Sequence, residues 1–164
     1  MVAALLLVGC RADVPPRPAA GGAVVSAAGA ARFPASDVLR EWDRARSQAF
    51  AEGDVEALRR LYVDGSAAGT SDVLLLRAYL ARGLRVEGMR MQLLAIEVLH
   101  RDPRRVRVLV TYRLTGAVAV GRGTRTRLPH DQASTRVVEL LRHDAEGPWQ
   151  VASVRESGQR RAAR

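Results

Sequence analysis

Apolar residues recur at helical spacing over the part of the chain that follows Ser36. The predicted helix N-caps are Ser36, Asp54, and Thr70 or Ser71. Gly53 and Gly83 end the first and third of three predicted helices, since glycine readily adopts the left-handed conformation beyond a helix. The apolar faces of the three helices are Val38, Trp42, Ala45 and Ala49; Val55, Leu58, Leu61 and Tyr62; and Val73, Leu76, Tyr79 and Leu80.

The hydrophobic period shortens to two residues from Val86 onward, which predicts strands. The predicted strands are 89–99, 106–114, 134–142 and a last one that starts at Trp149. Asp102-Pro103 marks a turn, and the glycine-spaced stretch 116–127 either continues a strand or forms a hairpin. Helices followed by a run of strands indicate an α+β fold, with three N-terminal helices packed on a curved antiparallel sheet of about four strands.

The first ten residues carry a second kind of pattern. A short apolar run leads to Leu7-Val8-Gly9-Cys10, which resembles the lipobox of bacterial lipoproteins, where the cysteine is acylated and the peptide is cut before it. The alternative is an apolar N-terminus with a chance cysteine, and the missing basic start would be explained by an upstream start codon. We therefore expect a signal segment at 1–9, a lipidated Cys10 with an Ala/Gly/Pro-rich tether over 10–35, a domain at 36–157 and a basic disordered tail at 158–164.

Charge changes this picture little. The net charge is +9, which alone would suggest nucleic acid or an acidic surface as a partner. All 26 basic residues are arginine, however, and a phosphate-binding surface has no reason to avoid lysine. A GC-rich genome explains the bias, so we do not expect nucleic-acid binding. Aromatic residues make up only 4% of the 164 residues, so the core must be built from Leu, Val and Ala.

One stretch of the domain carries a family resemblance. The run from Ala49 to Leu58, with its Gly53-Asp54 step and the following Leu61-Tyr62 and Asp64, resembles the start of the nuclear-transport-factor-2-like superfamily, which includes polyketide-cyclase-like domains. The resemblance covers roughly residues 36–156, and such domains occur in lipoproteins of high-GC actinobacteria. It implies a cone-shaped bent sheet around a long helix, with a pocket at the open end.

Candidate site residues are few. The candidates for pocket lining are Trp42, Tyr62, Tyr79, Tyr112 and Glu139. Aromatic residues on apolar faces more often pack in the core. Glu97 and Glu139 each interrupt an apolar strand, and each points either outward to solvent or to the concave side, with Arg113 as its partner. Asp43 lies one step off the apolar stripe of the first helix, so we expect it to be solvated. We identify no catalytic motif, metal-ligand constellation or cofactor site.

Three hypotheses of function remain. The favoured one is a non-enzymatic extracytoplasmic lipoprotein domain, anchored to the bacterial cell membrane, that binds a small apolar ligand or an envelope protein. The second is an isomerase- or cyclase-type enzyme, which predicts a buried carboxylate within hydrogen-bond reach of a Tyr or His. The third is an arginine-driven binder of anionic envelope polymers, which predicts a one-sided arginine patch. The sequence leaves the ligand, partner and oligomeric state open.

Overall fold

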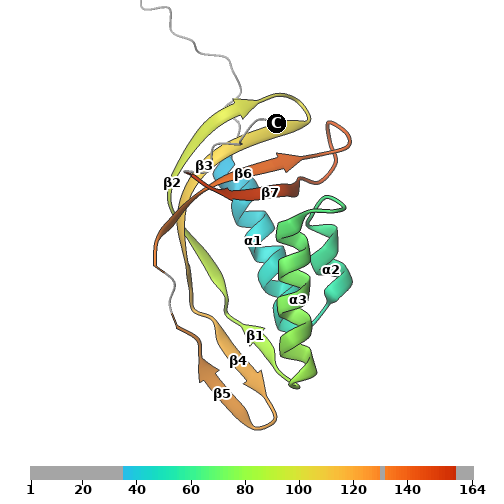
Figure 1. Ribbon diagram of the computed structural model, residues 1–164, viewed down its shortest axis with the longest axis vertical. Helices are drawn as coiled ribbons and strands as arrows, with labels where there is room; N and C mark the ends of the chain where they lie inside the picture. The colour runs from blue at the N-terminus through green and yellow to red at the C-terminus, as the bar shows by residue number, and fades with distance from the viewer. Residues whose placement is uncertain (1–34, 130–131, 158–164) are drawn as a thin grey trace, which may run out of the picture. The chain divides into compact units, whose positions relative to one another are not determined.

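The computed structural model describes residues 35–129 and 132–157, and it confirms the α+β order of three helices followed by antiparallel strands (Figure 1). The helices are α1 (Ala35–Glu52), α2 (Val55–Arg60) and α3 (Ala67–Ala81). The strands are β1 (Arg85–Glu87), β2 (Arg90–Arg101), β3 (Arg105–Thr115), β4 (Val118–Gly121), β5 (Thr124–Arg127), β6 (Ser134–Leu141) and β7 (Gln150–Glu156). The predicted signal segment, Cys10, the tether and the tail at 158–164 lie outside the described residues.

The helix boundaries follow local capping chemistry. Gly53 has a φ of 74° and ends α1, and the Asp54 carboxylate then accepts a hydrogen bond of 2.8 Å from the Ala57 amide. The predicted cap of α3 at Thr70 or Ser71 is wrong. The helix starts at Ala67 because Ser66, whose hydroxyl accepts from the amide of the third residue of the helix, caps it one turn earlier.

The strands form two sheets rather than the single one that the sequence predicts. The four-stranded sheet has the order β2-β3-β6-β7, and the three-stranded sheet has the order β1-β4-β5, with antiparallel pairing throughout. The stretch 116–127 therefore forms a hairpin, β4 with β5, and β1 is a short partner that the sequence did not predict. Helix α1 contacts both β1 and β2, so it lies across the junction of the two sheets (Figure 1).

Two glycines create that junction. Gly88 separates β1 from β2 and Gly116 separates β3 from β4, with φ angles of 67° and 76°. A Cβ atom on Gly116 would lie 2.6 Å from the Gly88 carbonyl oxygen, and one on Gly88 would lie 3.0 Å from the Gly116 oxygen. Only residues without a side chain allow both the left-handed backbone and this close approach. The chain therefore bends at one point on two neighbouring strands.

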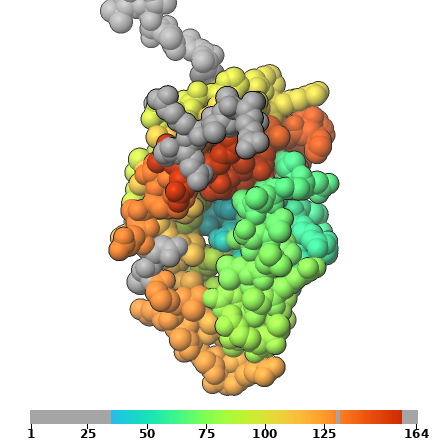
Figure 2. Space-filling view, in the orientation of Figure 1, coloured from blue at the N-terminus to red at the C-terminus, as the bar shows by residue number. Residues whose placement is uncertain are grey.

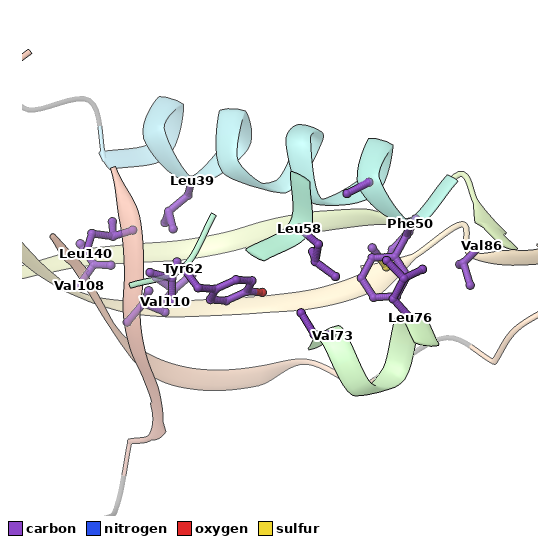
Figure 3. Packing of buried hydrophobic residues seen from close by; sticks show 14 of the residues in the cluster. Leu39, Phe50, Leu58, Tyr62, Val73, Leu76, Val86, Val108, Val110 and Leu140 are labelled. Carbon is purple, nitrogen blue, oxygen red and sulfur yellow. The ribbon is translucent and has the colours of Figure 1, made fainter. Parts of the chain in front are cut away.

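The core lies between the helices and the two sheets (Figure 3). The alternation predicted for the strand at 106–114 is confirmed in its first half, where Val106, Val108 and Val110 are buried and Arg107 is exposed; after Val110 both faces are mostly half-buried. As expected from the low aromatic content, Leu and Val dominate, and Phe50 is the only aromatic residue among the largest fully buried side chains of the described chain. The other members of that set are Leu39, Leu58, Leu76, Leu140 and Val151, with the three β3 valines.

The buried face of α1 agrees only in part with the predicted one. Ala49 of the predicted stripe is buried, but Leu39 and Phe50, which we expect to flank that stripe, are buried as well, with Ala35 at the start of the helix. Asp43 lies in the same row, four residues after Leu39. The apolar pattern points to a neighbouring stripe because this row also holds Arg46. Two ionisable residues thus sit on the face that a hydrophobicity pattern treats as solvent-exposed.

Candidate functional site

Asp43 is buried, contrary to the expectation that it is solvated. It retains 6% of its accessible surface, and its Oδ2 accepts a hydrogen bond of 2.8 Å from the Met91 amide. Met91 follows the bend at Gly88 and is the second residue of β2. One oxygen of the carboxylate therefore holds the strand just past the bend against α1.

The second oxygen has no such role. Asp43 Oδ1 is buried and accepts no hydrogen bond from the described residues. Burial raises the pKa of this carboxyl above its ordinary value, and the Met91 amide, then Arg46 and Arg90, oppose that rise. A buried acceptor without a partner is costly, since native proteins pair nearly all such groups. It marks a place where the fold leaves binding capacity unused.

Asp43 lines an open groove of about 550 Å³ between α1 and the start of β2. The groove also contains three arginines, Arg40, Arg44 and Arg90, and two thioethers, Met89 and Met91. Arg40 is engaged by Asp37 at 3.0 Å, and Arg44 and Arg90 are exposed. The groove therefore combines a buried hydrogen-bond acceptor with exposed cationic side chains, and most of its lining surface is apolar.

A second polar cluster lies one turn further along α1. The guanidinium of Arg46 makes a two-pronged ion pair with Asp72 of α3, in which Nη2 lies 2.8 Å from Oδ1 and Nε contacts Oδ2. The Tyr62 hydroxyl donates to Asp72 Oδ2 at 2.5 Å. Arg46 also stacks over the Phe50 ring, 5.1 Å from its centroid. The Arg46–Asp72 ion pair thus joins α1 to α3, and the remaining Arg46 nitrogen, Nη1, donates to the Met89 sulfur at 3.3 Å.

This cluster meets one criterion for an acid/base site, a carboxylate within hydrogen-bond reach of a tyrosine. Its chemistry argues against that use. Burial, followed by the Asp72 charge, raises the pKa of the Tyr62 hydroxyl well above its ordinary value, which makes it a poor acid near neutral pH. The pairing with Asp72 outweighs burial and raises the pKa of Arg46, which therefore stays charged and occupies the carboxylate. The cluster is arranged as a structural ion pair.

The space between α1 and the four-stranded sheet is small and apolar. It forms a cavity of about 40 Å³, and the residues that line it are Leu39, Trp42, Met91, Val110, Tyr112, Val138, Val151 and Val154. Figure 2 shows α1 through a narrow opening between β7 and α3. No Asp, Glu or His is among the described residues of its lining. This volume accommodates a water molecule or two but no organic ligand of ordinary size.

The five candidate lining residues do not come together at one site. Trp42 and Tyr112 line the apolar cavity, and the Trp42 indole donates to the Leu61 carbonyl at 3.2 Å. Tyr62 belongs to the Arg46 cluster, and it also lines a separate surface pocket at the start of α3. Tyr79 is partly buried under the Arg82 guanidinium, 4.9 Å from its ring centroid.

The acidic strand residues have partners other than the one we expected. Glu139 pairs with Arg105 of the neighbouring strand and accepts from the Ser153 hydroxyl at 3.4 Å, while Arg113 donates to Gln92 at 2.7 Å. Glu97 is exposed. The Glu139 side chain retains only 15% of its accessible surface, so this cross-strand pair lies partly inside the sheet rather than in a concave site with Arg113. Neither glutamate therefore faces Arg113 in a concave site.

Residues 35–129 and 132–157 hold neither a metal-binding cluster nor a membrane-spanning helix. No three His, Cys, Asp or Glu side chains in residues 35–129 and 132–157 approach closely enough to hold a metal ion. None of the helices in these segments combines the length and hydropathy of a membrane span.

Comparisons with known proteins bear on the fold alone. The chain is similar to the intermembrane space region of the chloroplast protein ARC6, with a TM-score of 0.50 and 18% identity over 75% of this chain and 95% of that one. An NTF2-like protein with a cystatin-like fold from Novosphingobium aromaticivorans is more distant, with a TM-score of 0.42 and 16% identity over 76% and 83% of the two chains. No protein-family model and no curated protein sequence matches.

Proposed function

We propose that this chain is a lipid-anchored, extracytoplasmic binding protein of NTF2-like fold, and that it holds a small polar ligand in the groove beside Asp43 without transforming it. The groove is the proposed binding site because it differs from the apolar cavity in volume and in chemistry. The groove offers about 550 Å³, charged side chains and an unused buried acceptor, whereas the apolar cavity offers about 40 Å³. A roomy concavity with a few convergent polar groups is the better place for a ligand.

The anchor is proposed from the sequence. Leu7-Val8-Gly9-Cys10 and the Ala/Gly/Pro-rich stretch after it fit a cleaved, acylated N-terminus that tethers a domain to the membrane. The test is mass spectrometry and membrane fractionation of the full chain in a bacterium that processes lipoproteins. We expect a diacylated Cys10 at the N-terminus and release into the soluble fraction for Cys10→Ser. An intact Met1 or a free Cys10 thiol would overturn the anchor.

The binding site has its own test. A fragment library screened by two-dimensional amide NMR should give hits that shift the Met91 amide, because this group bonds directly to Asp43. We expect no hits that shift only Val110 and Val138, which line the apolar cavity. Hits that shift only the cavity residues would show that the ligand binds inside the fold, and the groove would then not be the binding site. Chemical conversion of any hit by the protein would show that it is an enzyme and not only a binding protein.

A further inference from the structure

The geometry of the groove points to the class of its ligand. We propose that it is a small molecule with an anionic group for the groove arginines and an ammonium or hydroxyl donor for Asp43, a short distance apart. This inference rests on the proposed function and adds the chemistry of recognition.

The donor requirement follows from the two oxygens of Asp43. Oδ2 is committed to the Met91 amide, and this contact alone accounts for a structural role at the bend. Oδ1 contributes nothing to that role, yet it is buried without a partner in the described chain. A ligand N–H or O–H would supply the missing hydrogen bond and would remove the cost of an unpaired acceptor.

The anionic requirement follows from the groove's charge. Three arginines and one carboxylate line it, so the balance of charge in the groove is positive. Arg40 is already paired with Asp37, which leaves Arg44 and Arg90 as the cations to bind a ligand. Guanidinium groups bind phosphate and carboxylate with two parallel hydrogen bonds, which gives direction as well as charge. The Arg90 charge also acts on the Asp43 carboxyl, so the two groups belong to one site.

Binding at Oδ1 requires the side chains beside it in the groove to move. The groove neighbours of Asp43 include Arg44, Gln48 and Arg90, which are exposed and long. Such side chains change rotamer on the nanosecond timescale. Movement of these side chains would let a donor approach the buried oxygen.

The test uses one bifunctional probe and its two halves. O-phosphoethanolamine carries both groups, inorganic phosphate carries only the anion, and ethanolamine carries only the donor. Titrations followed by the Met91 amide should give an affinity for phosphoethanolamine about tenfold above that for phosphate, the gain expected of one charge-assisted hydrogen bond. Ethanolamine should bind weakest, and added salt should weaken phosphate binding.

Two variants separate the two contacts. Asp43→Asn keeps an acceptor for the Met91 amide and removes the charge, so it should abolish the preference for phosphoethanolamine over phosphate. Phosphate itself should bind as tightly as before or more tightly, because the substitution removes the one negative charge of the groove. Arg90→Gln should weaken phosphate and phosphoethanolamine alike. Arg107→Gln, at an exposed arginine of β3 outside the groove, is the matched control and should change neither. Equal binding of phosphoethanolamine and phosphate to the unmodified protein, or undiminished preference in Asp43→Asn, would overturn the inference.

Two further outcomes are distinguishable. Fragment hits in the groove without binding of either phosphate probe would overturn this ligand class and leave the proposed function standing, whereas no hits at all would remove both. Vesicles containing phosphatidylethanolamine test whether the shared chemistry belongs to a lipid headgroup. Preference for these vesicles over soluble phosphoethanolamine identifies a headgroup, and the reverse identifies a free molecule; both support the proposed chemistry.

Discussion

Two aspartates close to the same face of α1 have opposite surroundings. Asp72 uses both carboxylate oxygens, with Arg46 on each and Tyr62 on one. Asp43 uses one oxygen for the Met91 amide and leaves the other without a partner among the described residues. The difference teaches how to separate a structural polar group from a binding one: the first has its hydrogen-bonding capacity filled by the fold, and the second retains part of it.

The two sites should therefore respond differently to substitution. At the Asp72 cluster, loss of a partner leaves a buried charge behind, so the damage appears in the free energy of unfolding. At Asp43, the isosteric change removes a charge that burial already disfavours, so the damage appears in binding.

The largest loss of stability is expected for Asp72→Ala. The substitution leaves the Arg46 guanidinium in a site where its side chain retains 14% of its exposure, without its carboxylate. We expect the free energy of unfolding to fall by about 3 kcal/mol. Urea denaturation followed by circular dichroism measures this change. The double variant Arg46→Met with Asp72→Leu should recover most of the loss, because it removes both charges together. No loss in the single variant would mean that the ion pair is not structural.

A smaller loss is expected at the bend. Gly116→Ala places a Cβ 2.6 Å from the Gly88 carbonyl oxygen in a backbone with φ of 76°, so it should cost about 2 kcal/mol or more. Gly123→Ala is the matched control, since its φ is 74° and no atom lies within 4 Å of the added carbon. The control carries the left-handed strain alone, about 1 kcal/mol. Equal losses by thermal or urea unfolding would show that the close approach of the strands does not matter.

The sequence predicted most of the fold because the apolar pattern and the local capping signals agree. The Gly53-Asp54 step and the alternation in the first half of β3 appear in the structure as predicted. The second sheet could not be predicted in the same way. β1 has three residues and β5 has only exposed ones, so neither carries a hydrophobic period. Their pairing depends on the bend at Gly88 and Gly116, a contact between residues distant in the chain.

The candidate site was harder to find for a related reason. Hydrophobic periodicity assigns charged residues to the solvent face, whereas Asp43 and Arg46 lie on the buried face of α1. Arg46 is buried because Asp72, 26 residues away, pairs with it, and no local pattern reveals such a partner. The one available signal was position: Asp43 follows Leu39 by four residues and precedes Phe50 by seven, which is a helical row. Neighbouring apolar residues pointed more strongly to another row.

Tyr62→Phe tests the outer part of the filled cluster. The substitution removes only the hydroxyl that donates to Asp72, while the ring keeps its edge-to-face contact with Trp42 at 5.7 Å between centroids. Asp72 retains Arg46, so the loss should be about 1 kcal/mol in urea unfolding. Tyr112→Phe is the control, because no described residue bonds its hydroxyl, and it should change stability less. A larger loss of stability in Tyr112→Phe than in Tyr62→Phe would show that the hydrogen bond from Tyr62 to Asp72 does not stabilise the fold.

The smallest effect on stability is expected for Asp43→Asn, and it is a gain in stability, whereas the other substitutions cause a loss. Burial raises the pKa of Asp43 in the folded state above its ordinary value of 3.8, so the native protein holds this proton more tightly than the unfolded chain does. That preference stabilises the protein fully below the ordinary value and is lost as the pH rises through the raised pKa. Asp43→Asn lacks this dependence and keeps an acceptor for the Met91 amide, so it should be slightly more stable than the unmodified protein at neutral pH.

Unfolding of both proteins at a series of pH values gives the difference in their free energies of unfolding. We expect the stability of the unmodified protein relative to Asp43→Asn to fall as the pH rises above 3.8. A relative stability that rises instead would mean that Arg46 and Arg90 already neutralise the carboxylate, and Asp43 would then belong with Asp72 as a structural group.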